Sequence, residues 1–189
     1  MAFNVNEFIA KGLEFGGARP SLFEVQLTVP GIAFGGNSVD KFTFACQAAQ
    51  LPAATISQIE IPYFGRKIKV AGERSFDNWT VTIMNDEDFK VRSLFELWSN
   101  SLNSLESNVR GLGLDAENYK GELLVRQYGK DGAEIRSYRI VGAFPTDVSA
   151  IDLNWSSTNA VETFTATFAY DYWIPELESG GVNRYGAAV

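Results

Sequence analysis

The sequence contains no histidine and only one cysteine, Cys46, among its 189 residues. Without histidine the chain cannot form a Ser-His-Asp triad or a histidine-ligated zinc site, and one cysteine supplies neither an internal disulfide nor the ligands of an iron-sulfur cluster. Cys46 stands in the segment FTFACQA, which offers no basic neighbour to favour a thiolate, so we interpret it as a small buried hydrophobe. These absences exclude most of the common hydrolase and metalloenzyme mechanisms.

Long hydrophobic runs are missing as well. No stretch approaches the roughly 18 apolar residues of a membrane-spanning helix, and residues 1–20 lack the basic and apolar regions of a secretory signal. We therefore expect that the protein has no membrane anchor. We also expect that it is synthesised in a cytoplasm. The glycine motifs GxxxxGK[ST] and GxGxxG and the nucleophile motif GxSxG are also absent, so we expect no catalytic residue, no metal and no cofactor.

Positive charge is scarce, because 16 Lys and Arg residues face 23 Asp and Glu residues, for a formal net charge of -7. No run of five or six basic residues occurs, so duplex DNA would be repelled by the surface as a whole. The content of 46% hydrophobic and 21% charged residues is typical of a folded globular protein. We expect one domain over residues 1–189, with a core at about 18–173 and a C-terminal extension at 174–189.

Alternation of apolar and polar residues with a period of two predicts that most of the chain forms antiparallel strands. We expect strands at 21–29, 41–47, 76–84, 148–155 and 161–173, two extended arms within 55–72, and a hairpin of 121–129 and 134–142. A short helix at 3–11 and a surface loop at 103–119 complete the assignment.

One amphipathic helix is predicted after residue 84. Asn85 or Asp86 would cap it, and its apolar stripe would comprise Val91, Leu94, Phe95, Trp98 and Leu102. The acids Asp86, Glu87 and Asp88 could bind a cation or act as acid and base, but we interpret them as first-turn acids that suit the helix dipole. The fold class is therefore mainly β, with two packed antiparallel sheets as a sandwich or partly closed barrel and a helix on the flank.

Aromatic residues raise a second question of function, since exposed rows of rings bind sugars or bases. Trp79, Trp98, Phe164 and Phe168 fall on apolar faces, and we assign them to the core. Tyr170, Tyr172 and Trp173 remain open to two interpretations. They could form a platform for a carbohydrate, or they could pack against a neighbouring subunit.

A basic cluster lies on the extended arms, beside Tyr63 and Phe64. It comprises Arg66, Lys67, Lys69 and, further along, Arg74. Three interpretations stay open: a solvated face, a contact with an acidic partner surface, and a weak nucleic-acid track.

The stretch FACQAAQLPAATISQIEIPYFGRKIKVAGERSFDNWTVTIMNDEDFKVRSLFELW resembles the tail tube protein of contractile-tailed bacteriophages, most specifically in RKIKVAGERSFDNWTVTIMNDE. Supporting matches are ARPSLFEV, LLVRQYGKDG, GAFPTDVSAIDLNW and ETFTATFAYDYW. Together these segments cover most of residues 18–173 in the expected order.

The resemblance implies a non-enzymatic structural protein with two antiparallel sheets, a flanking helix and an extended arm. It further implies six-membered rings that stack into a hollow tube inside a sheath, in the virion of a phage. The implied partners are further copies of the chain, the tail sheath protein, baseplate and tail terminator proteins, and the tape measure protein, followed by genomic DNA that passes without specific binding.

Within such a tube, we expect the arm to reach a neighbouring subunit or ring. The expected contact residues are Ile61, Tyr63, Phe64, Arg66, Lys67, Lys69 and Arg74. Two alternative functions remain: the inner tube of a phage-derived injection or type VI-like secretion system, and a carbohydrate-binding β-sandwich.

Overall fold

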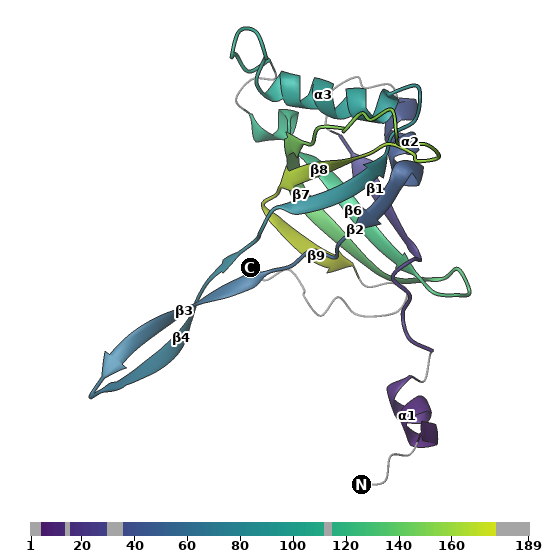
Figure 1. Cartoon of the computed structure of the whole chain (residues 1–189). Helices are drawn as coiled ribbons and strands as arrows, with labels where there is room; N and C mark the ends of the chain where they lie inside the picture. Colours follow the sequence, from purple (N-terminus) through teal and green to yellow (C-terminus); the bar gives the residue numbers. More distant parts are fainter. Residues whose placement is uncertain (1–4, 14–15, 30–35, 112–114, 177–189) are drawn as a thin grey trace.

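Strands dominate the architecture of the chain (Figure 1), which we describe from a computed structural model over residues 5–13, 16–29, 36–111 and 115–176. The strands are β1 (Phe23–Thr28), β2 (Cys46–Ala49), β3 (Thr55–Tyr63), β4 (Arg66–Ser75), β5 (Trp79–Met84), β6 (Gly121–Tyr128), β7 (Glu134–Val148), β8 (Thr163–Ala169) and β9 (Tyr172–Glu176). The helices are α1 (Val5–Gly12), α2 (Gly36–Ala45), α3 (Lys90–Leu102) and the short 3-10 helix η1 (Ala116–Asn118).

Seven strands pair antiparallel in the order β1-β6-β7-β8-β5-β2 with β9 beside β7, and β3 pairs only with β4. The 15-residue strand β7 belongs to two sheets, because residues 134–143 pair with β6 and residues 144–148 pair with β8. Within the described strands, β1 and β2 do not pair with each other, so the barrel stays open between them. The predicted fold class is confirmed.

β7 changes sheet close to Gly142, whose φ is 72°. Only glycine adopts such a backbone conformation without strain. A Cβ at this position would also overlap the carboxylate of Asp171. The Asp171 amide donates to the Val141 carbonyl at 3.1 Å, so the chain between β8 and β9 closes tightly over the bend.

The core lies between the two sheets and beneath α3 and α2. It consists of Val25, Leu27, Phe42, Trp79, Val81, Ile83, Val91, Leu94, Phe95, Trp98, Leu123, Val125, Ile140, Ala143, Phe164, Ala166 and Phe168. Phe95 stands at its centre, with ring centroids 5.6 Å from Phe42 and 5.7 Å from Phe168. The predicted stripe of α3 and the predicted core aromatics are confirmed, with Leu102 only partly buried.

The strand expected at 41–47 is wrong, because residues 36–45 form α2 and only β2 follows at 46–49. A strand would place Phe42 and Phe44 on one face, whereas a helix separates them by about 200°. Phe42 is fully buried and Phe44 is 84% exposed. The helix thus inserts one ring into the core and leaves the other in solvent.

Four further elements differ from the sequence-based expectation. The hairpin strand expected to end at Gly142 continues as β7 to Val148, and the strand expected at 148–155 is a loop beyond that point. The strand expected at 161–173 breaks at Tyr170-Asp171 into β8 and β9, and β9 takes in residues 174–176 of the expected extension. α3 begins at Lys90 after Phe89, whose φ is 51°, with no side-chain cap from Asn85 or Asp86.

The two extended arms form one hairpin, β3-β4, which projects from the body of the molecule (Figure 1). Pro62 lies within β3, which has β4 on one edge only, where a missing amide donor is tolerated. The expected helix at 3–11 corresponds to α1, and residues 3 and 4 lie outside the described residues. No helix in the described part of the chain is long and apolar enough to cross a membrane.

Candidate assembly surfaces

The arm, defined as the β3-β4 hairpin of residues 55–75, has one apolar and one polar face. Ile59 opposes Val70 and Ile61 opposes Ile68, and opposed residues of antiparallel strands share a face. The alternate residues Glu60 and Lys69 also oppose each other and lie on the other face. The register therefore gathers the apolar side chains of both strands into a single strip.

This apolar strip is open to solvent. Its members Ile59, Ile61, Tyr63, Ile68 and Val70 are 44% to 62% exposed. A lone two-stranded hairpin is marginally stable in water, and exposed apolar strips of this kind mark interaction sites. The strip is therefore a candidate interaction surface.

The arm ends in a strained two-residue turn. Phe64 has a φ of 43° and Gly65 a φ of 79°, the left-handed pair of a tight hairpin turn. A phenylalanine in this region is uncommon, and it stacks edge-on against Tyr63 with 4.7 Å between ring centroids. The turn thus presents two aromatic rings at the tip, with Phe64 91% exposed.

The cations of the arm differ in their partners. Lys67 pairs with Glu60 across the hairpin at 2.6 Å. Arg66, Lys69 and Arg74 form no ion pair with any residue that the structure describes. The structure brings the seven expected contact residues together on one hairpin, but Lys67 and Lys69 lie on the polar face and Arg74 lies near the base.

The base of the arm is fixed by aromatic side chains. Trp173 Nε1 donates to the Ala53 carbonyl at 3.0 Å, and the Tyr170 hydroxyl donates to the same oxygen at 3.4 Å. Tyr170 also packs against Phe76, with 5.9 Å between ring centroids. These contacts use two rings of the expected carbohydrate platform inside the chain and leave Tyr172 as its exposed member.

Two acidic residues before α3 form ion pairs with a lysine of α2. Lys41 of α2 bridges Asp86 and Asp88, at 2.6 Å from Asp88. Hydrogen bonding to Lys41 lowers the pKa of Asp88 to about 2, lowers the pKa of Asp86 and raises the pKa of Lys41. The carboxylates therefore have a structural function, although they precede the first helical turn instead of occupying it.

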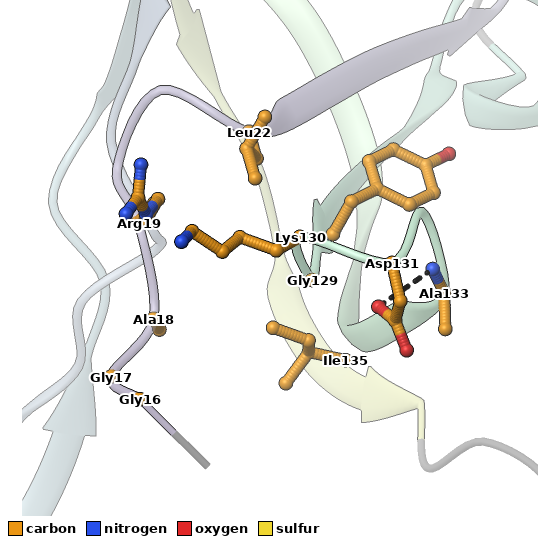
Figure 2. Close-up of a pocket in the computed structure, with 11 residues that line it drawn as sticks. Gly16, Gly17, Ala18, Arg19, Leu22, Gly129, Lys130, Asp131, Ala133 and Ile135 are labelled. Atoms are coloured by element: carbon orange, nitrogen blue, oxygen red, sulfur yellow. Dashed lines mark hydrogen bonds between the residues drawn. The ribbon is translucent and has the colours of Figure 1, made fainter. Parts of the chain in front are cut away.

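A hollow of about 580 Å³ lies between residues 16–22 and the β6-β7 turn. Figure 2 shows the Lys130 side chain extended toward Arg19 across this hollow. The Asp131 carboxylate accepts a hydrogen bond from the Ala133 amide at 3.2 Å, and the Tyr128 hydroxyl donates to Glu24. The Asp131 carboxylate thus holds the turn and the Tyr128 hydroxyl joins β6 to β1, so these groups of the lining form no acid and base aimed at a common point.

Cys46 packs partly buried against the core at the start of β2. Burial raises the pKa of its thiol to about 12, so the thiol stays protonated and unreactive at neutral pH. The interpretation as a small hydrophobe is confirmed.

Comparison with known proteins assigns the chain to a family. The family model for phage tail tube proteins matches residues 18–176. The chain belongs to the phage tail tube protein family. The tail tube protein gp19 of Enterobacteria phage T4 is 40% identical over 157 residues, which cover 82% of this chain and 90% of that protein. The tail tube protein of Serratia phage KSP90 is 22% identical over 167 residues, 88% of this chain and 93% of that protein.

Solved structures show the same tail tube fold. A chain of the anti-feeding prophage baseplate superimposes with a TM-score of 0.62 at 15% identity, over 85% of this chain and 95% of that chain. A chain of the sheath-tube complex of an extracellular contractile injection system gives 0.56 at 15% identity, over 93% and 99%. The chain is thus a tail tube subunit, a structural component of a phage particle.

Proposed function

We propose that six copies of this subunit form a ring and that the rings stack into a hollow tube inside a contractile sheath. The tube would start on baseplate proteins, end at a terminator protein, enclose the tape measure protein and then conduct the genome into the host. Synthesis and assembly would take place in the host cytoplasm. An injection-system inner tube is the alternative with the same architecture, and neighbouring genes distinguish it.

The open barrel supports ring formation. Among the described strands, β1 and β2 stand at the two ends of the strand order of the seven-stranded sheet, and each carries an unpaired edge, as does β9 beside β7. Edges of this kind invite pairing with another chain, and a heterologous contact repeated around an axis closes them into a ring. Ring formation would therefore remove two edges that a lone subunit leaves exposed.

The observation that carries the proposal is the solvent-exposed apolar strip of the arm. We propose that the arm contacts a neighbouring copy through Ile61, Tyr63, Phe64 and Arg66 on the strip and tip, with Lys67, Lys69 and Arg74 meeting carboxylates of that copy. Burying several half-exposed aliphatic side chains supplies about 25 cal/mol per Å² of apolar surface. Each subunit would make this contact once.

Electron microscopy of the purified subunit over a concentration series tests the proposal. We expect hollow six-fold rings or tubes from the unmodified chain. The double variant Ile61→Asp/Ile68→Asp places two charges on the apolar strip and should yield folded subunits without tubes. Leu105 and Val109 are 90% and 62% exposed outside the arm, so Leu105→Asp/Val109→Asp is the matched control and should still assemble. Tubes of normal length from the strip variant would contradict the proposal.

A further inference from the structure

The two ends of β5 lead to two different exposed surfaces. Trp79 begins β5 directly after the arm, and Met84, at its other end, pairs with Thr163 where the loop of residues 149–162 enters β8. Six residues of strand span about 20 Å. The arm and this loop lie at opposite ends of the molecule (Figure 1).

The loop carries an apolar surface of its own, the loop patch, defined as Leu153, Trp155 and Val161. Leu153 is 80% exposed, Val161 is 68% exposed and Trp155 is fully exposed. A hollow of about 500 Å³ is lined by the same loop, including all three residues. Single exposed apolar residues are ordinary, but three around one hollow form a surface that suits an apolar partner.

The charges of the two surfaces are opposite in sign. Residues 147–163 contain the carboxylates Asp147, Asp152 and Glu162 and no lysine or arginine. Asp147 and Asp152 form no ion pair with any described residue, and Glu162 accepts a hydrogen bond from Asn85. Arg92 is the nearby cation, and it is bound to Glu96 and to the Ser149 carbonyl.

The arm has the complementary composition. Residues 55–75 carry four cations against two carboxylates, Glu60 and Glu73. Arg66, which has no ion pair in the described structure, opposes Tyr63 and therefore shares the face of the apolar strip, whereas Lys69 lies on the polar face. An apolar strip with unpaired cations would match an apolar patch with unpaired carboxylates.

We propose that the arm of one subunit docks on the loop patch of a second copy in the adjacent ring, with the apolar strip covering Trp155 and with Arg66, on the same face as the strip, facing Asp152. One copy cannot satisfy both surfaces, because they lie at opposite ends of the molecule. The contact is therefore head to tail, and between rings stacked along one axis such a contact repeats without closing on itself. This inference rests on the proposed tube assembly and specifies which surface receives the arm.

Mixing two blocked variants tests the contact. The arm variant Ile61→Asp/Ile68→Asp keeps an intact loop patch, and the patch variant Leu153→Asp/Trp155→Asp keeps an intact arm. Each variant alone should stop at single rings. Equal amounts of both should give stacks of two rings and no longer tubes, since only one direction of docking remains between the two kinds of ring. Long tubes from the patch variant alone would overturn the inference, and so would single rings from the mixture.

Charge exchange provides an independent readout. Arg66→Glu and Asp152→Arg should each reduce the amount of sedimented tube several-fold at low salt, and the double variant should recover most of the loss. No recovery in the double variant would contradict the pairing of Arg66 with Asp152. Glu117→Arg is the matched control at an exposed carboxylate outside the patch and should not rescue Arg66→Glu.

Disulfide trapping covers the case in which the charged variants fold poorly. In a Cys46→Ala background, Ile61→Cys/Trp155→Cys should give a ladder of oxidised multimers from assembled tubes. Ile61→Cys/Phe44→Cys, with the second thiol at an exposed position on α2, should give no ladder. Tubes that form normally but yield no ladder with Trp155→Cys would refute the docking while leaving the tube proposal intact. Absence of any ring or tube from the unmodified chain would refute the tube proposal itself.

Discussion

Lys41 connects α2 to the segment that precedes α3 through two carboxylates, and the connection depends on pH. The pKa of Asp88 lies at about 2, well below its ordinary value of about 4. A carboxyl whose pKa falls on folding stabilises the native state above the unfolded pKa and loses this effect as pH falls through the folded pKa. The ion pairs of Lys41 therefore weaken between about pH 4 and pH 2.

We predict that Lys41→Met reduces the loss of thermal stability between about pH 4 and pH 2, because the variant lacks the ion pairs that acid would otherwise break. The melting temperature by circular dichroism across this range measures the effect. Lys69→Met removes the same charge from a lysine without an ion pair in the described structure and should leave the slope unchanged. Parallel curves for Lys41→Met and the unmodified chain would show that the ion pair contributes nothing.

Gly142 allows β7 to serve two sheets. We predict that Gly142→Ala lowers the free energy of unfolding by more than about 1 kcal/mol, because alanine is strained at this positive φ and its Cβ meets Asp171. Urea titration measures the change. Gly111→Ala is the control, since a Cβ there makes only an ordinary contact with the Ser101 carbonyl at 3.7 Å. Equal stability of the two variants would contradict the importance of the bend.

At the scale of elements, α3 covers the core, and Trp98 is the residue that holds it there. Trp98 is fully buried and its Nε1 donates to the Tyr119 carbonyl at 2.9 Å. We predict that Trp98→Ala costs about 3 to 5 kcal/mol of stability, through lost burial and a cavity. Trp98→Phe keeps most of the apolar volume and should cost about 1 to 3 kcal/mol, mainly through the orphaned carbonyl. Denaturant unfolding distinguishes the two, and equal losses would contradict this division.

The arm provides an element-scale prediction on charge. We predict that Lys67→Glu/Lys69→Glu reduces tube formation, because the cations would no longer meet carboxylates of the neighbouring copy. The loss should shrink at high salt, which screens charges beyond a few Å. Sedimentation at about 50 mM and about 1 M salt measures both effects. Intact assembly at both salt concentrations would eliminate the electrostatic contribution of the arm.

Elements with a regular alternation could be predicted from the sequence, and elements set by distant contacts could not. Trp79, Val81 and Ile83 alternate cleanly because β5 has one core face. The segment 41–47 alternates as well, yet residues 41–45 fold as the end of α2, where Phe42 reaches Phe95 on α3, and no local pattern records that contact. The break between β8 and β9 likewise depends on the Asp171 amide meeting the Val141 carbonyl.

The arm was predictable as extended chain with exposed cations, but its single apolar strip was not. The strip depends on register, since it requires Ile61 to face Ile68 across the hairpin. The turn at Phe64 fixes that register with a backbone conformation that phenylalanine rarely adopts, so composition alone gave no signal for it. The hydrogen bond from Trp173 to the Ala53 carbonyl joins residues 120 positions apart, and it could not be predicted from the sequence either.

At the scale of the whole molecule, the net charge bears on how the proposed tube would interact with DNA. A chain of -7 gives -42 for a ring of six copies, as 6 × -7. A lumen wall that displays part of this charge would repel phosphates over a Debye length of about 8 Å at physiological salt, without driving them. The proposed lumen would therefore act as a non-adhesive conduit.

We predict that assembled tubes retain no linear duplex DNA at about 150 mM salt, as measured by cosedimentation. A basic DNA-binding protein run in parallel verifies that the assay detects retention. DNA that pellets with the tubes and is released only by higher salt would contradict a non-adhesive wall.

The continuity of the arm with β5 also determines how the subunit bears mechanical load. A pull on the arm acts along β5, which is held on one side by β8 and on the other by β2. Hydrogen bonds loaded lengthwise in this way share the force and must break together, whereas a strand peeled from its end loses them one at a time. The attachment of the arm therefore places tension on the molecule in shear, the direction in which an antiparallel sheet resists best.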